Sequence, residues 1–303
     1  MLLDYTQMTE LKAELEKCQK TIQKILNSDI FYDEVEDDAQ KEKIAVYSLT
    51  SDRFEMFEAS LKSLFFNSDV DKVIMITDDK KSAPILPKEV ETMILKKPPS
   101  FLKPDGPNMN NKFTIMCLIR LGFHEMFKQY DKILSLDYDT IVRRDISSLW
   151  DTPLGNKYYL AAVAEPNRTR GSIYGYFPKA NFICHSSVRF KKVTYINGGV
   201  LLMNLKKLRD DGTGDEMIEM LNEDMFLFPE QDILNACCHR NIYLLDPDYN
   251  SCRVTEETVN PKIIHYATME KKMDYEDVAF YNALSWDEVK RHRELNYKKS
   301  LTI

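Results

Sequence analysis

The sequence contains no long apolar run and no excess of basic residues. No segment approaches the roughly 20 consecutive apolar residues that a membrane helix needs, and the N-terminus lacks an apolar stretch behind a basic segment. We therefore expect neither a membrane span nor a secretion signal. The net charge is −7 and the lysines are spread along the chain, so no basic stripe is available to neutralise phosphates. Nucleic acid is not an expected partner.

Cysteine pairs at the spacing of a metal or redox site are also lacking. None of the six cysteines belongs to a CxxC pair, and several lie in segments with the pattern of buried helix or strand. This usage fits reduced thiols in a cytoplasmic protein. No linker rich in Pro, Gly or Ser interrupts the middle of the 303 residues, which predicts one large α/β domain with helical additions.

Apolar residues recur at intervals of three and four near the N-terminus. The series is Met8, Leu11, Leu15, Cys18, Ile22 and Ile25. Its spacing predicts a helix with one narrow apolar seam, and we assign residues 1–40 to this N-terminal helical arm. Because the seam is short, packing on the chain's own domain is favoured over a contact between two copies in a homodimer.

Strand and helix patterns alternate from residue 43 onwards. The expected elements are strands at 43–49, 72–77, 92–95 and 132–136, with helices at 54–66 and 111–128. Beyond them the pattern is mixed, with strands expected at 158–164, 200–204, 242–245 and 262–265 and helices at 216–221, 231–238 and 286–299. This alternation predicts a mostly parallel sheet flanked by helices, with ligands at the carboxyl ends of its strands.

Two carboxylates follow one of the expected strands. In KILSLDYDTIV an apolar run leads to Asp137 and Asp139, with Tyr138 between them. Alternate residues of a strand face the same side, so the carboxylates are expected to project together. Such hard oxygen ligands suit Mg²⁺ or Mn²⁺, and a cation of this kind stabilises a departing diphosphate. The alternative is a turn or cap residue at Asp137 and a solvated charge at Asp139.

Five parts of the chain carry patterns that belong together. They are LTSDRF (49–54), NNKF (110–113), DYD (137–139), YINGGVLLMNLKKLR (195–209), and PEQDILN (229–235) with HYATMEK (265–271). In order and spacing, over residues 43–273, they resemble glycosyltransferase family 8, the retaining GT-A enzymes that include glycogenins and bacterial lipopolysaccharide galactosyltransferases. The resemblance implies a Rossmann-like GT-A domain over residues 41–275 and leaves residues 276–303 as a C-terminal helical extension.

The resemblance also implies ligands for a cation and a nucleotide. Asp137, Asp139 and His265 would hold the metal ion, and an imidazole ligand favours Mn²⁺ over Mg²⁺. Lys271 would contact the diphosphate. The other implied donor-binding residues are Leu49, Thr50, Ser51, Phe54, Lys112, Tyr138, Asn197 and Gly198. Outside the family context, His265 reads as a buried core histidine and Lys271 as a solvated charge.

Three further residues are implied to act at the sugar. Glu165 ends LAAVAE, where the family has an Asp that binds sugar hydroxyls. Gln231 would steady the oxocarbenium-like centre, and Glu230 would contact hydroxyls of the donor or acceptor. The sequence departs from the family pattern in having Glu for Asp at 165 and 230. It also departs in HYATMEKKM, where Thr268, Lys272 and Met273 replace Gly, Pro and Trp.

Taken together, the resemblance implies a retaining, Mn²⁺-dependent transferase. It would move a hexose, glucose or galactose, from a UDP-sugar to a glycan, lipopolysaccharide or protein acceptor. The stretch 166–192, rich in Arg, Tyr, Phe and Lys, is expected to face the acceptor, or else to be a variable surface loop.

Two other functions stay open. A haloacid dehalogenase-type phosphohydrolase also has an apolar run before DxDxT/V, with Asp137 as nucleophile and Asp139 as acid/base. That motif belongs on the first strand, whereas at least two strand and helix units precede it here. The second alternative is a non-catalytic protein that binds a nucleotide sugar without turnover, which the replacements at Thr268 and Met273 favour.

Overall fold

The computed structural model of the chain describes residues 42–79, 85–109, 114–165, 195–226, 228–252, 260–267 and 275–300. The helical arm expected at 1–40, Lys112, Lys271 and the stretch 166–192 lie outside these residues. The domain boundaries inferred from the sequence stay predictions.

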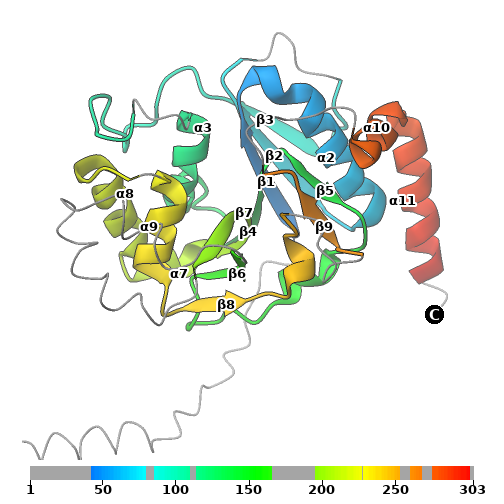
Figure 1. The fold of residues 1–303 in the computed structure, drawn as a ribbon. Helices are drawn as coiled ribbons and strands as arrows, with labels where there is room; N and C mark the ends of the chain where they lie inside the picture. The colour runs from blue at the N-terminus through cyan, green and yellow to red at the C-terminus, as the bar shows by residue number, and fades with distance from the viewer. Residues whose placement is uncertain are drawn as a thin grey trace, which may run out of the picture. The chain divides into compact units, whose positions relative to one another are not determined.

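A seven-stranded sheet runs through the centre of the described chain (Figure 1). Its spatial order is β3 (Val90–Ile94), β2 (Lys72–Thr77), β1 (Ile44–Leu49), β4 (Lys132–Leu136), β7 (Ile196–Asn204), β6 (Leu160–Ala164) and β8 (Ile242–Leu244). The first four strands are parallel, and β6 and β8 are parallel to each other. Only β7 runs antiparallel to both of its neighbours. The mostly parallel sheet expected from the sequence is therefore confirmed.

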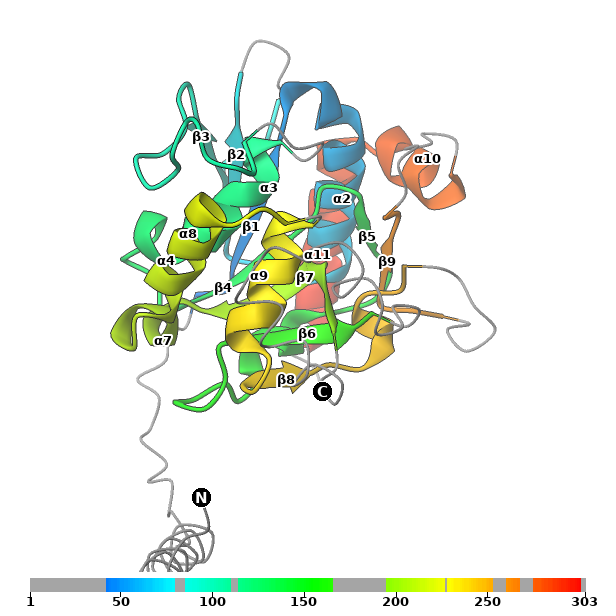
Figure 2. The ribbon, with the colours of Figure 1, turned by 60° about the vertical axis from the view of Figure 1, so that its left-hand side comes forward.

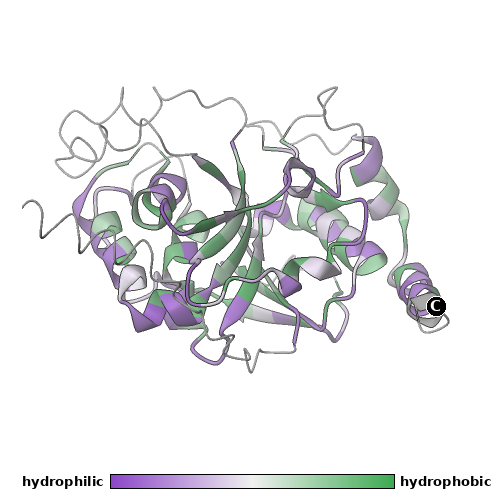
Figure 3. Ribbon diagram, turned by 90° about the horizontal axis from the view of Figure 1, so that it is seen from below, coloured by the Kyte–Doolittle hydropathy of each residue, from purple (hydrophilic) through white to green (hydrophobic). Residues whose placement is uncertain are grey.

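Helices cover both faces of the sheet (Figures 1 and 2). Because side chains alternate along a strand, Ile44 and Val46 of β1 enter one apolar cluster, while Ala45 and Tyr47 enter the other. The first face carries α3 (Ile115–Leu118), α4 (Phe123–Met126), α7 (Leu205–Asp210), α8 (Thr213–Glu223) and α9 (Pro229–Cys238), and the second carries α2 (Phe54–Asn67) and α11 (Trp286–Ser300). Figure 3 shows the strands largely in the hydrophobic colour, as their burial on both faces requires.

The structure differs from the sequence pattern in several short elements. The helix expected at 111–128 is broken where it is described, with a 3-10 turn at Ile119–Gly122 between α3 and α4. A Cβ on Gly122 would lie 2.2 Å from Cζ of Phe101, so the ring of Phe101 packs directly against this backbone. Two short elements, α7 and β5 (Thr140–Val142), had no clear pattern in the sequence, whereas α10 (Glu276–Ala283) lies within the C-terminal extension expected to be helical.

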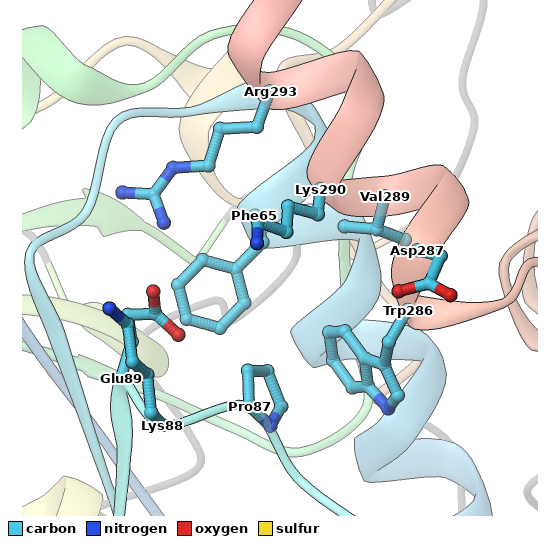
Figure 4. Close-up of a pocket in the computed structure, with 9 residues that line it drawn as sticks. All are labelled: Phe65, Pro87, Lys88, Glu89, Trp286, Asp287, Val289, Lys290 and Arg293. Atoms are coloured by element: carbon cyan, nitrogen blue, oxygen red, sulfur yellow. The ribbon is translucent and has the colours of Figure 1, made fainter.

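The last two helices pack on α2. Phe66 of α2 stacks on His292 of α11 with ring centroids 3.6 Å apart, and meets Tyr281 of α10 edge-on. A pocket of about 260 Å³ lies beside this contact, with Phe65 and Trp286 in its wall and charged side chains such as Arg293 around it (Figure 4). Among the helices that the structure describes, none is long and apolar enough to cross a bilayer.

Candidate active site

The carboxylate pair lies in a turn beyond the end of β4. Two backbone hydrogen bonds hold this turn: Asp137 N–H donates to Gly199 O, and Tyr266 N–H donates to Asp139 O, both at 2.9 Å. The next residues form β5, which pairs antiparallel with β9 (Ile263–His265), so that Thr140 lies opposite His265. The two carboxylates therefore converge because of a turn and a short second sheet, and not by the strand alternation that the sequence suggested.

Asp137, Asp139 and His265, the three residues that the family resemblance groups, lie together in the structure. Nε2 of His265 lies 3.4 Å from Oδ2 of Asp137 and 3.3 Å from Oδ1 of Asp139. Asp139 and His265 are each 3% exposed. One imidazole and two carboxylates, all within reach of a single point, fit a small divalent cation of the Mn²⁺ or Mg²⁺ class.

The charged groups at this point shift one another's pKa values. Burial alone lowers the pKa of His265, but the carboxylates of Asp139 and Asp137 outweigh it and hold the pKa well above its usual value. Burial raises the pKa of Asp137, but Arg120 and His265 outweigh it and hold that pKa well below its usual range. The raised pKa of His265 thus reflects the two carboxylates beside it, and the lowered pKa of Asp137 reflects the cationic groups beside it.

Arg120 is a residue of the site that the sequence analysis missed. It is 3% exposed, and its guanidinium donates to three acceptors: Asp137, Oε1 of Glu230 at 2.8 Å and Gly198 O at 2.5 Å. Burial alone lowers its pKa, but Glu230 and Asp137 raise it above the usual value. It lies in the apolar stretch 115–123. A lone arginine within such a stretch was the available signal, because a buried cation requires acidic partners.

Gly198 and Gly199 bring the backbone of β7 against the charged groups. A Cβ on Gly198 would lie 2.9 Å from Oε1 of Glu230, and one on Gly199 would lie 2.1 Å from Cε1 of His265. Any side chain at Gly199 would displace the imidazole ring. The register of the β6–β7 pair shifts between Ala162 and Ala164, so the pairing of these two strands is irregular beside the site.

The first turn of α9 supplies Glu230 and Gln231. Burial raises the pKa of Glu230 to about 7 despite its ion pair with Arg120. Oε1 of Gln231 accepts the Gly198 N–H at 2.8 Å. One turn along, Asn235 accepts Ile196 N–H at 2.8 Å and donates to Ile196 O at 3.1 Å. These bonds fix α9 to β7, so Glu230 and Gln231 meet Gly198 at a defined distance.

Glu165 and Asn197 lie at the same end of β6 and β7. Nδ2 of Asn197 donates to Oε2 of Glu165 at 2.8 Å. Asn197 is buried, whereas Glu165 is partly exposed. A carboxylate held in this way beside Gly198 remains able to meet a hydroxyl.

The segment Leu49–Phe54 leaves β1 beside the carboxylate turn. β1 and β4 are parallel, and Tyr47 lies opposite Leu136, so Leu49 ends next to the residues that follow β4. The Ser51 N–H donates to Oδ1 of Asp78, at the end of β2, at 2.8 Å. Thr50 and Ser51 are partly exposed, while Phe54 anchors α2 in the core. The loop is therefore fixed where a ligand at the carboxyl ends of the strands would lie.

Comparison with known proteins shows what this chain is similar to. The family model described as "Glycosyl transferase family 8" matches residues 43–273. A putative glycosyltransferase of Haemophilus influenzae is 22% identical over 52% of this chain and 45% of its own length. Glycosyltransferase GlyA of Streptococcus pneumoniae is 27% identical over 56% of this chain and 24% of its own length. The chain thus spans less than half the length of these two relatives.

Solved structures share the fold at low sequence identity. The bifunctional glycosyltransferase WbbM gives a TM-score of 0.60 at 18% identity, over 84% of this chain and 52% of that one. The galactosyltransferase LgtC, solved with donor and acceptor sugar analogs, gives 0.53 at 19% identity, over 83% of this chain and 94% of that one. The layered sheet described above is therefore the GT-A fold of these proteins.

Proposed function

Because the chain belongs to glycosyl transferase family 8 and is a glycosyltransferase, we propose that it transfers a hexose from a UDP-sugar with retention of configuration. The proposed acceptor is a glycan, a lipopolysaccharide or a protein. The observation that carries the proposal is the convergence of Asp137, Asp139 and His265 beside Gly198 and Gly199. Proposed cation ligands suit a diphosphate, and the two glycines beside them leave room for the attached sugar to lie against the backbone.

Asp137, Asp139 and His265 are the proposed ligands of a divalent cation, Mn²⁺ or alternatively Mg²⁺. Such an ion supplies positive charge to the departing diphosphate. The ring of His265 and the two carboxylates are already within 3.4 Å, so little rearrangement of the chain is needed to bind it. Lys271, proposed from the sequence, would add a second cation at the phosphates.

The proposed sugar-binding residues surround the two glycines. Glu165, held by Asn197, would accept hydrogen bonds from sugar hydroxyls, and Glu230 would contact hydroxyls of the donor or the acceptor. Gln231 would offer an amide dipole to the positive charge that develops at the anomeric carbon, since one lone pair of its oxygen already accepts from Gly198 N–H. In this scheme the acceptor oxygen bonds to the anomeric carbon as the bond to the diphosphate breaks. The acceptor proton passes to the departing phosphate.

The nucleoside would bind in the loop after β1. Leu49, Thr50, Ser51 and Phe54 are proposed to contact the uridine, with Tyr138 beside them and Lys112 at the donor. Support comes from the anchoring of Ser51 to Asp78, which gives this loop a defined position at the carboxyl end of β1.

The two rival functions predict different behaviour. A haloacid dehalogenase-type enzyme needs its DxD after the first strand, but here the pair follows the fourth strand in chain order. The family membership also disfavours it. A non-catalytic sugar-nucleotide-binding protein would bind the donor without any slow hydrolysis, whereas a transferase releases free sugar slowly when no acceptor is present.

The test is a thermal-shift panel of UDP-, GDP- and CMP-sugars with and without Mn²⁺, followed by hydrolysis assays on the donors that stabilise the chain. We expect stabilisation by UDP-sugars that depends on Mn²⁺, together with slow release of the hexose. Equal stabilisation by all three nucleotides, or binding that is unchanged in EDTA, would contradict the assigned donor and metal.

A further inference from the structure

We propose that Asn250 is a positioning residue that keeps a hydrogen on Nδ1 of His265 and so leaves Nε2, which faces Asp137 and Asp139, as the nitrogen that would take a cation. The inference rests on the proposed function, because it concerns how the chain prepares the metal site. Asn250 belongs to none of the motifs from which the site was inferred. It follows the 3-10 turn Pro247–Tyr249 in a stretch whose sequence, DPDYNS, is typical of a surface turn.

The argument starts from a backbone N–H, whose role as a donor is fixed. Gly199 N–H lies 2.8 Å from Oδ1 of Asn197, so this atom of the amide must be the oxygen. The other end of the amide is therefore NH₂, and it faces the carboxylate of Glu165 at 2.8 Å, as a donor should. Two independent partners thus agree on the orientation of Asn197.

This orientation determines that of Asn250. Oδ1 of Asn197 can only accept, and Asn250 reaches it at 2.8 Å, so Asn250 presents its NH₂ group there. Its own Oδ1 must then face the other way, toward Nδ1 of His265 at 3.0 Å. Since that oxygen can only accept, Nδ1 of His265 must carry a hydrogen.

The consequence falls on the opposite side of the imidazole ring. Because Nδ1 keeps its hydrogen for Asn250, Nε2 is the nitrogen that would give up its proton and offer a lone pair when a cation binds, and it is the one that faces both carboxylates. Sγ of Cys252 also lies near Nδ1, at 3.8 Å, but a thiol is a weak partner and the oxygen of Asn250 is closer. The amide chain therefore selects the tautomer that can bind metal.

Burial and the backbone keep this chain of amides in place. Asn250 and His265 are each 3% exposed and Asn197 is 7% exposed, so bulk water competes little for their hydrogen bonds. Ser251, next to Asn250, donates its N–H to Ile263 O and accepts the His265 N–H, both at 3.0 Å. The backbone of the next residue, Ser251, thus ties Asn250 to β9, and the side chain of Asn250 links it to Asn197 of β7.

The experiment measures Mn²⁺ binding rather than activity. Free Mn²⁺ is titrated by its EPR signal in the presence of UDP, for the wild-type chain, Asn250→Ala, Asn250→Asp and the control Asn108→Ala. Asn108 is equally buried and makes three hydrogen bonds to backbone atoms of Leu221, Asp224 and Phe226, so its loss tests general destabilisation. We expect Asn250→Ala to weaken Mn²⁺ binding about 10- to 100-fold. Asn250→Asp, which keeps an acceptor opposite Nδ1, should restore part of the affinity, and Asn108→Ala should bind as the wild type does.

A second measurement needs no variant at Asn250. In the wild-type chain labelled with ¹⁵N-histidine and loaded with Mg²⁺ and UDP, His265 should give an Nδ1–H signal that is missing from His265→Gln. An Nε2–H signal would overturn the inference, as would wild-type affinity for Mn²⁺ in Asn250→Ala or an equal loss in Asn108→Ala. Failure of the wild-type chain to bind Mn²⁺ would be a different result, since it would remove the proposed metal centre and this inference with it.

Discussion

Among single residues, Arg120 combines almost complete burial with three acceptors, two of them carboxylates. Removing one partner of a buried ion pair leaves the other charge without compensation, which costs about 3–5 kcal/mol. We therefore predict that Arg120→Met lowers the free energy of unfolding by about that much. Arg120→Lys should recover only part of the loss, because one ammonium cannot reach Asp137, Glu230 and Gly198 O together. Urea unfolding measures both variants.

A control separates this effect from the loss of any ion pair. Arg144 pairs with Asp248 at 2.6 Å, but both side chains are more than a third exposed. Exposed pairs contribute about 0–1 kcal/mol, so Arg144→Met should change stability by no more than that. If the two methionine variants unfold at the same urea concentration, Arg120 does not organise the site as described.

Asp139 carries the second residue-scale prediction. Asp139→Asn keeps the size of the side chain and removes a proposed ligand charge, so transfer and Mn²⁺-dependent binding of UDP should be abolished while the melting temperature stays close to that of the wild type. Asp131→Asn, an exposed change at the other end of β4, is the matched control and should remain active. Normal turnover of Asp139→Asn, or of the wild type in EDTA, would refute the ligand assignment.

At the scale of elements, the approach of β7 to β9 is as important as the charges. The backbone of Gly199 passes so close to His265 that a methyl group has no room, with 2.1 Å from the ideal Cβ to Cε1 of the ring. We predict that Gly199→Ala displaces the imidazole and sharply weakens Mn²⁺ binding, measured by the same EPR titration.

Gly155 supplies the control for this change. Its φ of +47° is strained for alanine, but nothing lies within 4 Å of a Cβ there. Gly155→Ala should therefore cost roughly 1 kcal/mol of stability and leave Mn²⁺ binding intact. Full Mn²⁺ affinity in Gly199→Ala would show that the ring has another position from which it can bind.

At the scale of the whole molecule, the prediction is the stereochemistry of transfer. An inverting enzyme needs a base on the face opposite the leaving group. Of the described groups near Gly198, Glu230 is paired with Arg120, Glu165 accepts a hydrogen bond from Asn197, and Gln231 carries no charge. An α-linked donor should therefore give an α-linked product, read from the anomeric coupling in a proton NMR spectrum. Gln231→Ala should slow transfer without changing the anomer. A β-linked product would contradict the proposed mechanism.

The sequence by itself determined the elements that carry strong periodic or apolar patterns. β1, β2 and β4 begin within a residue of where they were expected, because each is a short apolar run buried on both faces. The grouping of Asp137, Asp139 and His265 was also expected, since DYD follows such a run and HYATMEK resembles a family motif; that the three residues bind a metal stays a prediction. Periodic patterns within one strand or helix, and motifs with a fixed spacing, can be recognised in the sequence alone. The acceptor and the dimer contact were not decided in this way, and the location in the cytoplasm stays a prediction.

Only the tertiary structure decided how these elements meet. β5 has three residues, too few for a periodic signal, yet its pairing with β9 brings His265 to the carboxylates. Arg120 lies within an apolar stretch, which signals that it needs acidic partners, and Asn250 lies within a turn, but neither position identifies which distant residues those partners are. Their roles depend on distances across strands and helices: a guanidinium that bridges β7, α9 and the turn after β4, and an amide whose orientation is set by a backbone N–H of β7. Such contacts follow from the packed fold, because burial removes the water that would otherwise satisfy each of these groups.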